Sequence, residues 1–180
     1  LIFLAVTYEW YNMNKNNKLI RIFGIIFLFF SFFIAFYLRK NSFNFFLLII
    51  VVCIFTDIGG YIFGKVFKGL KLTKISPNKT LSGVIGSFLI SLIAGLIYLD
   101  YAGNRDIFIK DHLKIFLLIL FISFVSQLGD LIISYFKRKA NLKDTGKILP
   151  GHGGFLDRID GLIFAFPASY ILTLIVESIY

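Results

Sequence analysis

The sequence predicts an all-α integral membrane protein, a polytopic helical bundle of about five full transmembrane helices plus a partial N-terminal one. Hydrophobic residues make up 58% of the 180 residues and charged residues only 16%, whereas soluble domains carry about 45–50% and about 25%. The apolar residues, among them 23 phenylalanines, gather in long runs. A soluble domain of this size could not bury so much apolar surface in one core, so we exclude that class.

Five segments have the length of a transmembrane helix, for which about 20 mostly apolar residues are needed. They are 20–38, 43–64, 81–100, 113–136 and 155–178, and a partial segment covers 1–11. Each run ends where charged or polar residues begin, in connectors at 12–19, 39–42, 65–80, 101–112 and 137–154. Because the chain begins with Leu inside an apolar stretch, we expect a truncated N-terminus.

Successive spans alternate in direction, so alternate connectors face the same side of the membrane. The segments 12–21, 65–80 and 137–154 carry thirteen lysines and arginines, whereas the opposite side carries five. Basic residues concentrate on the cytoplasmic side of membrane proteins, so we expect the first set to face the cytoplasm. This topology and anionic ligands explain the net charge of +9 without nucleic acid as a partner. The single cysteine, Cys53, excludes an intramolecular disulfide and a cysteine metal cluster.

Four aspartates lie inside the predicted spans, where an ionisable side chain costs about 2.5–3.5 kcal/mol and usually marks function. Asp57 and Asp130 lie near the cytoplasmic ends of their spans, and Asp157 and Asp160 lie in the first turns of the last span. All four should therefore lie about 5–12 Å from the cytoplasmic boundary. Neighbouring carboxylates repel one another unless a cation neutralises them, and oxygen ligands suit Mg²⁺. The alternative is that each acid pairs with a nearby base, for instance Asp157 with Arg158 or a lysine.

Two polar segments near these aspartates are typical of anion binding. The connector 65–80 ends in KISPNKTLSG, so Ser76, Lys79 and Thr80 precede a helix whose N-terminus faces the cytoplasm. Free backbone N–H groups at a helix N-terminus attract phosphate. The last span follows PGHGG, whose glycines let the backbone approach a ligand closely. Each segment alone is compatible with an ordinary turn. Together with the carboxylates they indicate phosphoryl or nucleotidyl transfer to a lipid at the cytoplasmic membrane surface, with Mg²⁺.

The segment 134–160, SYFKRKANLKDTGKILPGHGGFLDRID, resembles the complete signature of the phosphatidate cytidylyltransferase (CDP-diacylglycerol synthase) family. TDIGGYIFGK, KISPNKTLSG and SQLGDLIISYFKR are similar to further family segments, in the expected order, and YEW fits the family's earlier spans. The resemblance implies a single membrane-embedded domain over 1–180, with 134–160 as its signature loop and the start of its last helix. The departure is in length, because family members usually carry extra N-terminal spans.

The resemblance implies that CTP and phosphatidic acid give CDP-diacylglycerol and pyrophosphate, with Mg²⁺, in the inner (plasma) membrane with the active site facing the cytoplasm. The residues that it implies to be catalytic are Asp130, Asp157, Asp160, Lys143 and Asp144. Its implied metal ligands are Asp130, Asp157 and Asp160, with Asp57 at the edge of the site and a second, monovalent cation such as K⁺. Its implied substrate-binding residues are Ser76, Lys79, Thr80, Ser134, Lys137, Arg138, His152, Gly153, Gly154 and Arg158. The family also implies a homodimer.

Other functions remain open on the residues alone. A CDP-archaeol synthase or a CTP-dependent prenol kinase would also act on a lipid at the cytoplasmic surface, but a kinase would release CDP instead of pyrophosphate. An ion-coupled transporter would also need carboxylates in its spans, although here they cluster at one face instead of marking a path across the membrane. A chain without its N-terminal spans could also fold and not turn over.

Overall fold

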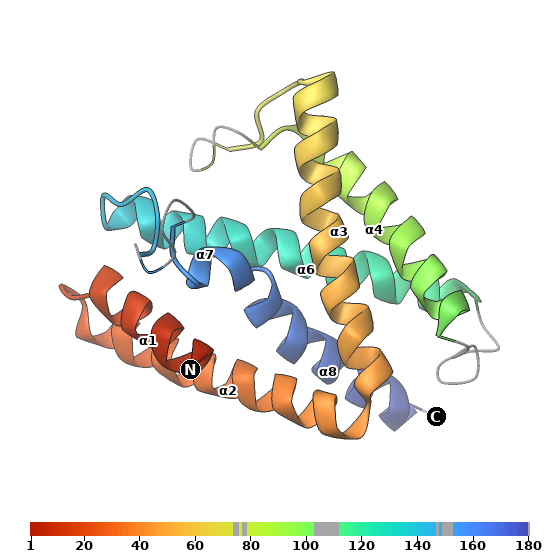
Figure 1. Cartoon of the computed structure of the whole chain (residues 1–180), viewed down its shortest axis with the longest axis horizontal. Helices are drawn as coiled ribbons and strands as arrows, with labels where there is room; N and C mark the ends of the chain where they lie inside the picture. Colours follow the sequence, from red (N-terminus) through yellow and green to blue (C-terminus); the bar gives the residue numbers. More distant parts are fainter. Residues whose placement is uncertain (74–75, 77–78, 103–111, 147, 149–152, 180) are drawn as a thin grey trace.

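In the part of the chain that it describes, the computed structural model contains five helices that are long and apolar enough to cross a membrane, which confirms the predicted helical bundle (Figure 1). The structure describes residues 1–73, 76, 79–102, 112–146, 148 and 153–179. The helices are α1 (Ile2–Met13), α2 (Lys18–Asn41), α3 (Phe43–Phe67), α4 (Leu81–Tyr101), α6 (His112–Lys139), α7 (Leu156–Ile159) and α8 (Leu162–Ile179).

The helices from α2 to α6 begin and end within three residues of the predicted spans. Helices α2, α3 and α6 extend past the apolar runs, because lysines and arginines in their last turns can place their stems along the helix and their charges in the headgroup region. Local caps set several ends. The Asn17 side chain accepts a hydrogen bond from Ile20 N at 3.2 Å at the start of α2, and Ser42 alone separates α2 from α3.

The last span differs from the single continuous helix that the sequence predicts. Helix α7 ends at Ile159 and α8 begins at Leu162, with Asp160 and Gly161 in a turn between them. A Cβ atom added to Gly161 would lie 2.3 Å from the Ser126 Oγ atom, so the turn passes very close to α6. This contact is possible because residue 161 has no side chain.

Helices α3 and α4 form a closely packed pair that stands at an angle to the rest of the bundle (Figure 1). A Cβ atom added to Gly59 would lie 2.4 Å from the Gly86 carbonyl oxygen, as expected where small residues let transmembrane helices approach. Hydrogen bonds tie this pair together and to α6: Thr56 Oγ1 lies 2.8 Å from Ser123 Oγ, and Ser87 Oγ donates to the Thr56 carbonyl at 2.7 Å.

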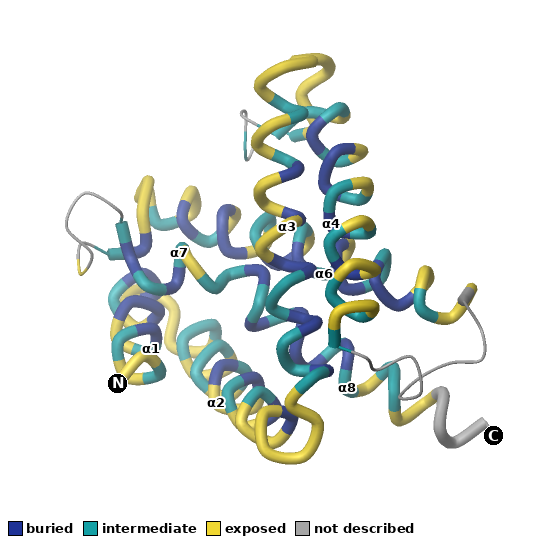
Figure 2. Tube along the Cα trace, turned by 45° about the vertical axis from the view of Figure 1, so that its right-hand side comes forward, coloured by how far each residue is buried: buried dark blue, intermediate teal, exposed yellow. Residues whose placement is uncertain are grey.

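Exposed residues lie on the outward faces of the helices, and buried residues lie where helices meet (Figure 2). Many of the exposed residues are large and apolar. On α2, for example, Phe23, Phe29 and Phe33 are 56–70% exposed, whereas Leu28 and Ile34 are buried. A soluble protein rarely exposes so much apolar surface, but a bilayer covers it. The pattern agrees with a multi-pass membrane protein.

Candidate active site

A cleft of about 350 Å³ opens between α3, α4, α6 and α7. Its lining residues are Thr56, Asp57, Gly60, Tyr61, Ser76, Lys79, Thr80, Gly83, Val84, Ser87, Gln127, Asp130, Asp157 and Asp160. The four aspartates singled out in the sequence therefore line one cleft. They share it with the polar residues that precede α4, so carboxylates and potential phosphate-binding groups face the same space.

Asp130 of α6 and Asp160, the C-terminal cap of α7, both line this cleft. Lys79 forms an ion pair with Asp130, and its Nζ atom also lies 3.4 Å from the Gln127 carbonyl oxygen. Ser134, one turn further along α6, donates a hydrogen bond to Asp130 Oδ1 at 3.3 Å. Asp130 thus has a lysine and a serine as its neighbours in this part of the site.

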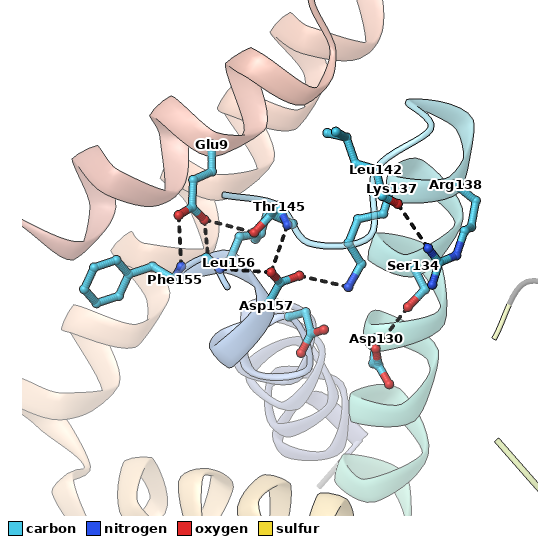
Figure 3. Close-up of polar contacts among 12 residues, drawn as sticks. Glu9, Asp130, Ser134, Lys137, Arg138, Leu142, Thr145, Phe155, Leu156 and Asp157 are labelled. Carbon is cyan, nitrogen blue, oxygen red and sulfur yellow. Dashed lines mark hydrogen bonds and ion pairs between the residues drawn. The ribbon is translucent and has the colours of Figure 1, made fainter. Parts of the chain in front are cut away.

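A lysine side chain and backbone N–H groups donate hydrogen bonds to the Asp157 carboxylate (Figure 3). Its Oδ1 atom accepts a hydrogen bond from Lys137 Nζ at 2.8 Å, and its Oδ2 atom accepts from the backbone N–H groups of Thr145 at 2.8 Å and Gly154 at 3.1 Å. The alternative that Asp157 pairs with a lysine is therefore confirmed. The same ion pair engages Lys137, which the family resemblance assigns to substrate binding.

The donor set fits a cation that is held partly by its substrate. No group of three or more acidic, histidine or cysteine side chains in the described part of the chain could hold a metal ion by itself. Mg²⁺, however, is commonly bound by one or two carboxylates, with water and substrate phosphates completing its six ligands. Asp130 and Asp160, which both line the cleft, would supply such a pair, and Asp57 lines the same cleft.

The start of α4 offers a second polar wall. Thr80 is the N-cap of α4, and its Oγ1 atom accepts a hydrogen bond from Gly83 N at 3.1 Å. Ser76 and Lys79 lie beside it in the lining of the cleft. The first backbone N–H groups of a helix have no acceptor within the helix and favour an anion. This wall therefore suits the phosphates of a nucleotide.

Several residues that the resemblance assigns to the site are not among the described residues that line the cleft. Lys143 and Asp144 are exposed in the connector between α6 and α7, and Arg138 donates to the Leu142 carbonyl at 3.1 Å. The others in this group are Ser134, Lys137, Gly153, Gly154 and Arg158. His152 lies outside the described residues. The roles implied for all of these remain predictions.

The structure also brings forward two residues without a role in the sequence predictions. Glu9 of α1 is 1% exposed and binds the segment that leads into α7. Gln127 lines the cleft, and its Nε2 atom is buried without a partner among the described residues. Glu9 could have been found by the rule applied to the aspartates, because it is an ionisable residue inside an apolar segment.

Comparisons with known proteins show which family the chain is similar to. A model of the cytidylyltransferase family matches residues 1–176. A phosphatidate cytidylyltransferase of Rickettsia bellii is 36% identical over 177 residues, which are 96% of this chain and 77% of that protein. The Rickettsia prowazekii protein of the same name is 34% identical over 97% of this chain and 78% of its own length. The one from Staphylococcus haemolyticus is 43% identical over 74% of this chain and 50% of its own length.

Proposed function

The chain belongs to the cytidylyltransferase family, and we propose that it transfers the cytidylyl group of CTP to phosphatidic acid, giving CDP-diacylglycerol and pyrophosphate. The observation that carries the proposal is the match of the family over nearly the whole chain, together with relatives that bear the name of this activity. The cleft supports it, because it places carboxylates and phosphate-binding groups between membrane-spanning helices.

In this reaction an oxygen of the lipid phosphate attacks the α-phosphorus of CTP, and pyrophosphate leaves. The lipid phosphate is already ionised at neutral pH, so no strong general base is needed. The Thr80 cap, the N-terminus of α4 and Lys79 would orient the phosphates of CTP at one wall of the cleft. Orientation is the main contribution that a protein makes to phosphoryl transfer, since little covalent chemistry falls to its side chains.

Asp130 and Asp160 would hold Mg²⁺, with Asp57 and Asp157 in the same lining. When bound, the cation would neutralise phosphate charge as the bond to pyrophosphate breaks. Ser134 would keep the Asp130 carboxylate oriented through its hydrogen bond. A second, monovalent cation and a homodimer are further predictions from the family resemblance.

The cleft lies at the end of the bundle where α3 ends and α4 begins and where the chain returns from α6 to α7. The connectors at this end belong to the basic set of thirteen lysines and arginines, so this side would face the cytoplasm, where CTP is found. We place the protein in the inner (plasma) membrane. The lipid substrate would reach the cleft laterally from the bilayer.

The test is a turnover assay with protein purified in detergent micelles, labelled CTP and phosphatidic acid. We expect labelled CDP-diacylglycerol and pyrophosphate with Mg²⁺, none in EDTA, and recovery when Mg²⁺ is restored. Asp160→Asn should abolish turnover without loss of folded protein, whereas Asp100→Asn, exposed in the last turn of α4, should match the wild type. Release of CDP with a phosphorylated lipid would instead indicate a kinase, and full activity of Asp160→Asn would refute the metal site.

A further inference from the structure

Glu9 places a carboxylate inside the bundle, away from the cleft. It belongs to α1, and its neighbours on that helix, Val6, Trp10 and Met13, form a buried apolar cluster together with Leu156. Only 1% of Glu9 is exposed. Burying a charged group is unfavourable unless hydrogen bonds compensate it, so its partners identify what it holds.

Among the described residues, three groups donate hydrogen bonds to Glu9, and these three lie between α6 and the first residue of α7 (Figure 3). Thr145 Oγ1 lies 3.0 Å from Glu9 Oε2, Leu156 N lies 2.9 Å from the same oxygen, and Phe155 N lies 3.0 Å from Oε1. The carboxylate therefore joins two places that are eleven residues apart, Thr145 and Leu156 at the start of α7.

Asp157, which lines the cleft, accepts hydrogen bonds from the same two parts of the chain. Its Oδ2 atom accepts from Thr145 N and from Gly154 N. Thr145 thus connects the two carboxylates, with its hydroxyl on Glu9 and its backbone N–H on Asp157. We call this arrangement of Glu9, Thr145 and Asp157 the double clamp.

The chain leaves a fitted space for the Glu9 carboxylate. A Cβ atom added to Gly146 would lie 2.6 Å from Glu9 Oε1, and one added to Gly154 would lie 2.5 Å from Glu9 Oε2. Both glycines flank the residues that donate to Glu9 or Asp157. Any larger residue at either position would push the carboxylate away from its donors. The two glycines therefore leave space for one carboxylate beside its hydrogen-bond donors.

We propose that Glu9 is a positioning residue for the proposed transfer reaction, on which this inference rests. Through the double clamp it holds both ends of the 145–156 segment together. Asp157 thereby keeps its place against Lys137, and Asp160, at the C-terminal cap of α7, keeps its place in the lining of the cleft. The first helix would thus be part of the catalytic apparatus although it contributes no residue to the described lining of the cleft.

Glu9→Gln keeps the size of the side chain but presents an N–H group to donors that need an acceptor. We expect the folded protein to be retained while kcat falls about 10- to 100-fold, since small displacements of catalytic groups have effects of this order. The KM for CTP should change by less than about threefold, because the wall at α4 is untouched. Asp100→Asn is the matched acid-to-amide control, and its kcat should equal that of the wild type.

Two substitutions of Thr145 test the link without altering Glu9. Thr145→Val removes the donor hydroxyl at nearly equal volume, and kcat should fall about tenfold. Thr145→Ser keeps the hydroxyl and should restore most of the wild-type rate. If Glu9→Gln yields no folded protein, the two Thr145 variants test the proposal in its place. If Thr145 only fills space, Thr145→Ser should have no higher kcat than Thr145→Val.

Hydrogen exchange gives a readout apart from activity. In Glu9→Gln, peptides covering 153–160 should exchange faster, because the amide keeps one acceptor oxygen and so either Phe155 N or Leu156 N loses its acceptor, whereas peptides from α3 and α4 should be unchanged. Unchanged exchange at 153–160, or equal kcat in Glu9→Gln and wild type, would overturn the inference. An inactive wild type would instead refute the proposed function itself.

Discussion

Replacing Lys137 by Met should destabilise the protein, because Asp157 would lose the cation that balances it. Lys137 Nζ lies 2.8 Å from Asp157 Oδ1, and each of the two side chains is only 11% exposed. Met has nearly the length of Lys and keeps its apolar stem in place. The substitution therefore removes the charge with little change in packing.

The magnitude follows from what Asp157 retains. Removing one partner of a buried ion pair costs about 3–5 kcal/mol. Asp157 keeps two backbone donors, Thr145 N and Gly154 N, and these continue to compensate part of its charge. We therefore expect a loss of about 2–3 kcal/mol in the free energy of unfolding. A loss of 1 kcal/mol lowers Tm by about 2–4 °C in a chain of this size, so Tm should fall by roughly 4–12 °C.

The assay is thermal unfolding in detergent, followed by intrinsic fluorescence. Lys137→Arg keeps the charge and should lose less, and Lys139→Met on the same helix, at an exposed position, should stay near the wild type. The double substitution Lys137→Met/Asp157→Asn removes both charges and should be less destabilised than the sum of the single substitutions. Equal Tm values for Lys137→Met and Lys139→Met, or strict additivity in the double variant, would refute the argument.

Three further predictions concern the walls of the cleft. Gly59→Ala would place a Cβ atom 2.4 Å from the Gly86 carbonyl, forcing α3 from α4 at a cost of about 1–3 kcal/mol, and a lower Tm would show it. Thr80→Ala removes the cap on Gly83 N and should cost about 1 kcal/mol, whereas Thr80→Ser should not; equal Tm values for the two would contradict this. Lys79→Met should raise the KM for CTP about tenfold, because it removes one charge-assisted contact to phosphate, and an unchanged KM would exclude the lysine from nucleotide binding.

The sequence alone determined which segments cross the membrane and on which side the polar groups gather. In lipid each spanning segment must satisfy its own backbone hydrogen bonds, so an apolar run of sufficient length becomes a helix whatever surrounds it. The helices from α2 to α6 therefore begin and end within three residues of the predicted spans. Because successive spans alternate in direction, the sequence predicted Asp57 and Asp130 at the same side as Asp157 and Asp160. In the structure all four line one cleft.

Only the tertiary structure decided which of these groups touch. Hydropathy does not encode how helices are rotated and packed, so it could not show that Lys79 pairs with Asp130 or that Lys137 pairs with Asp157. It also could not show that Glu9 reaches Thr145, a residue 136 positions away in the chain. That contact depends on α1 lying against the start of α7, and on glycines that leave space for one carboxylate.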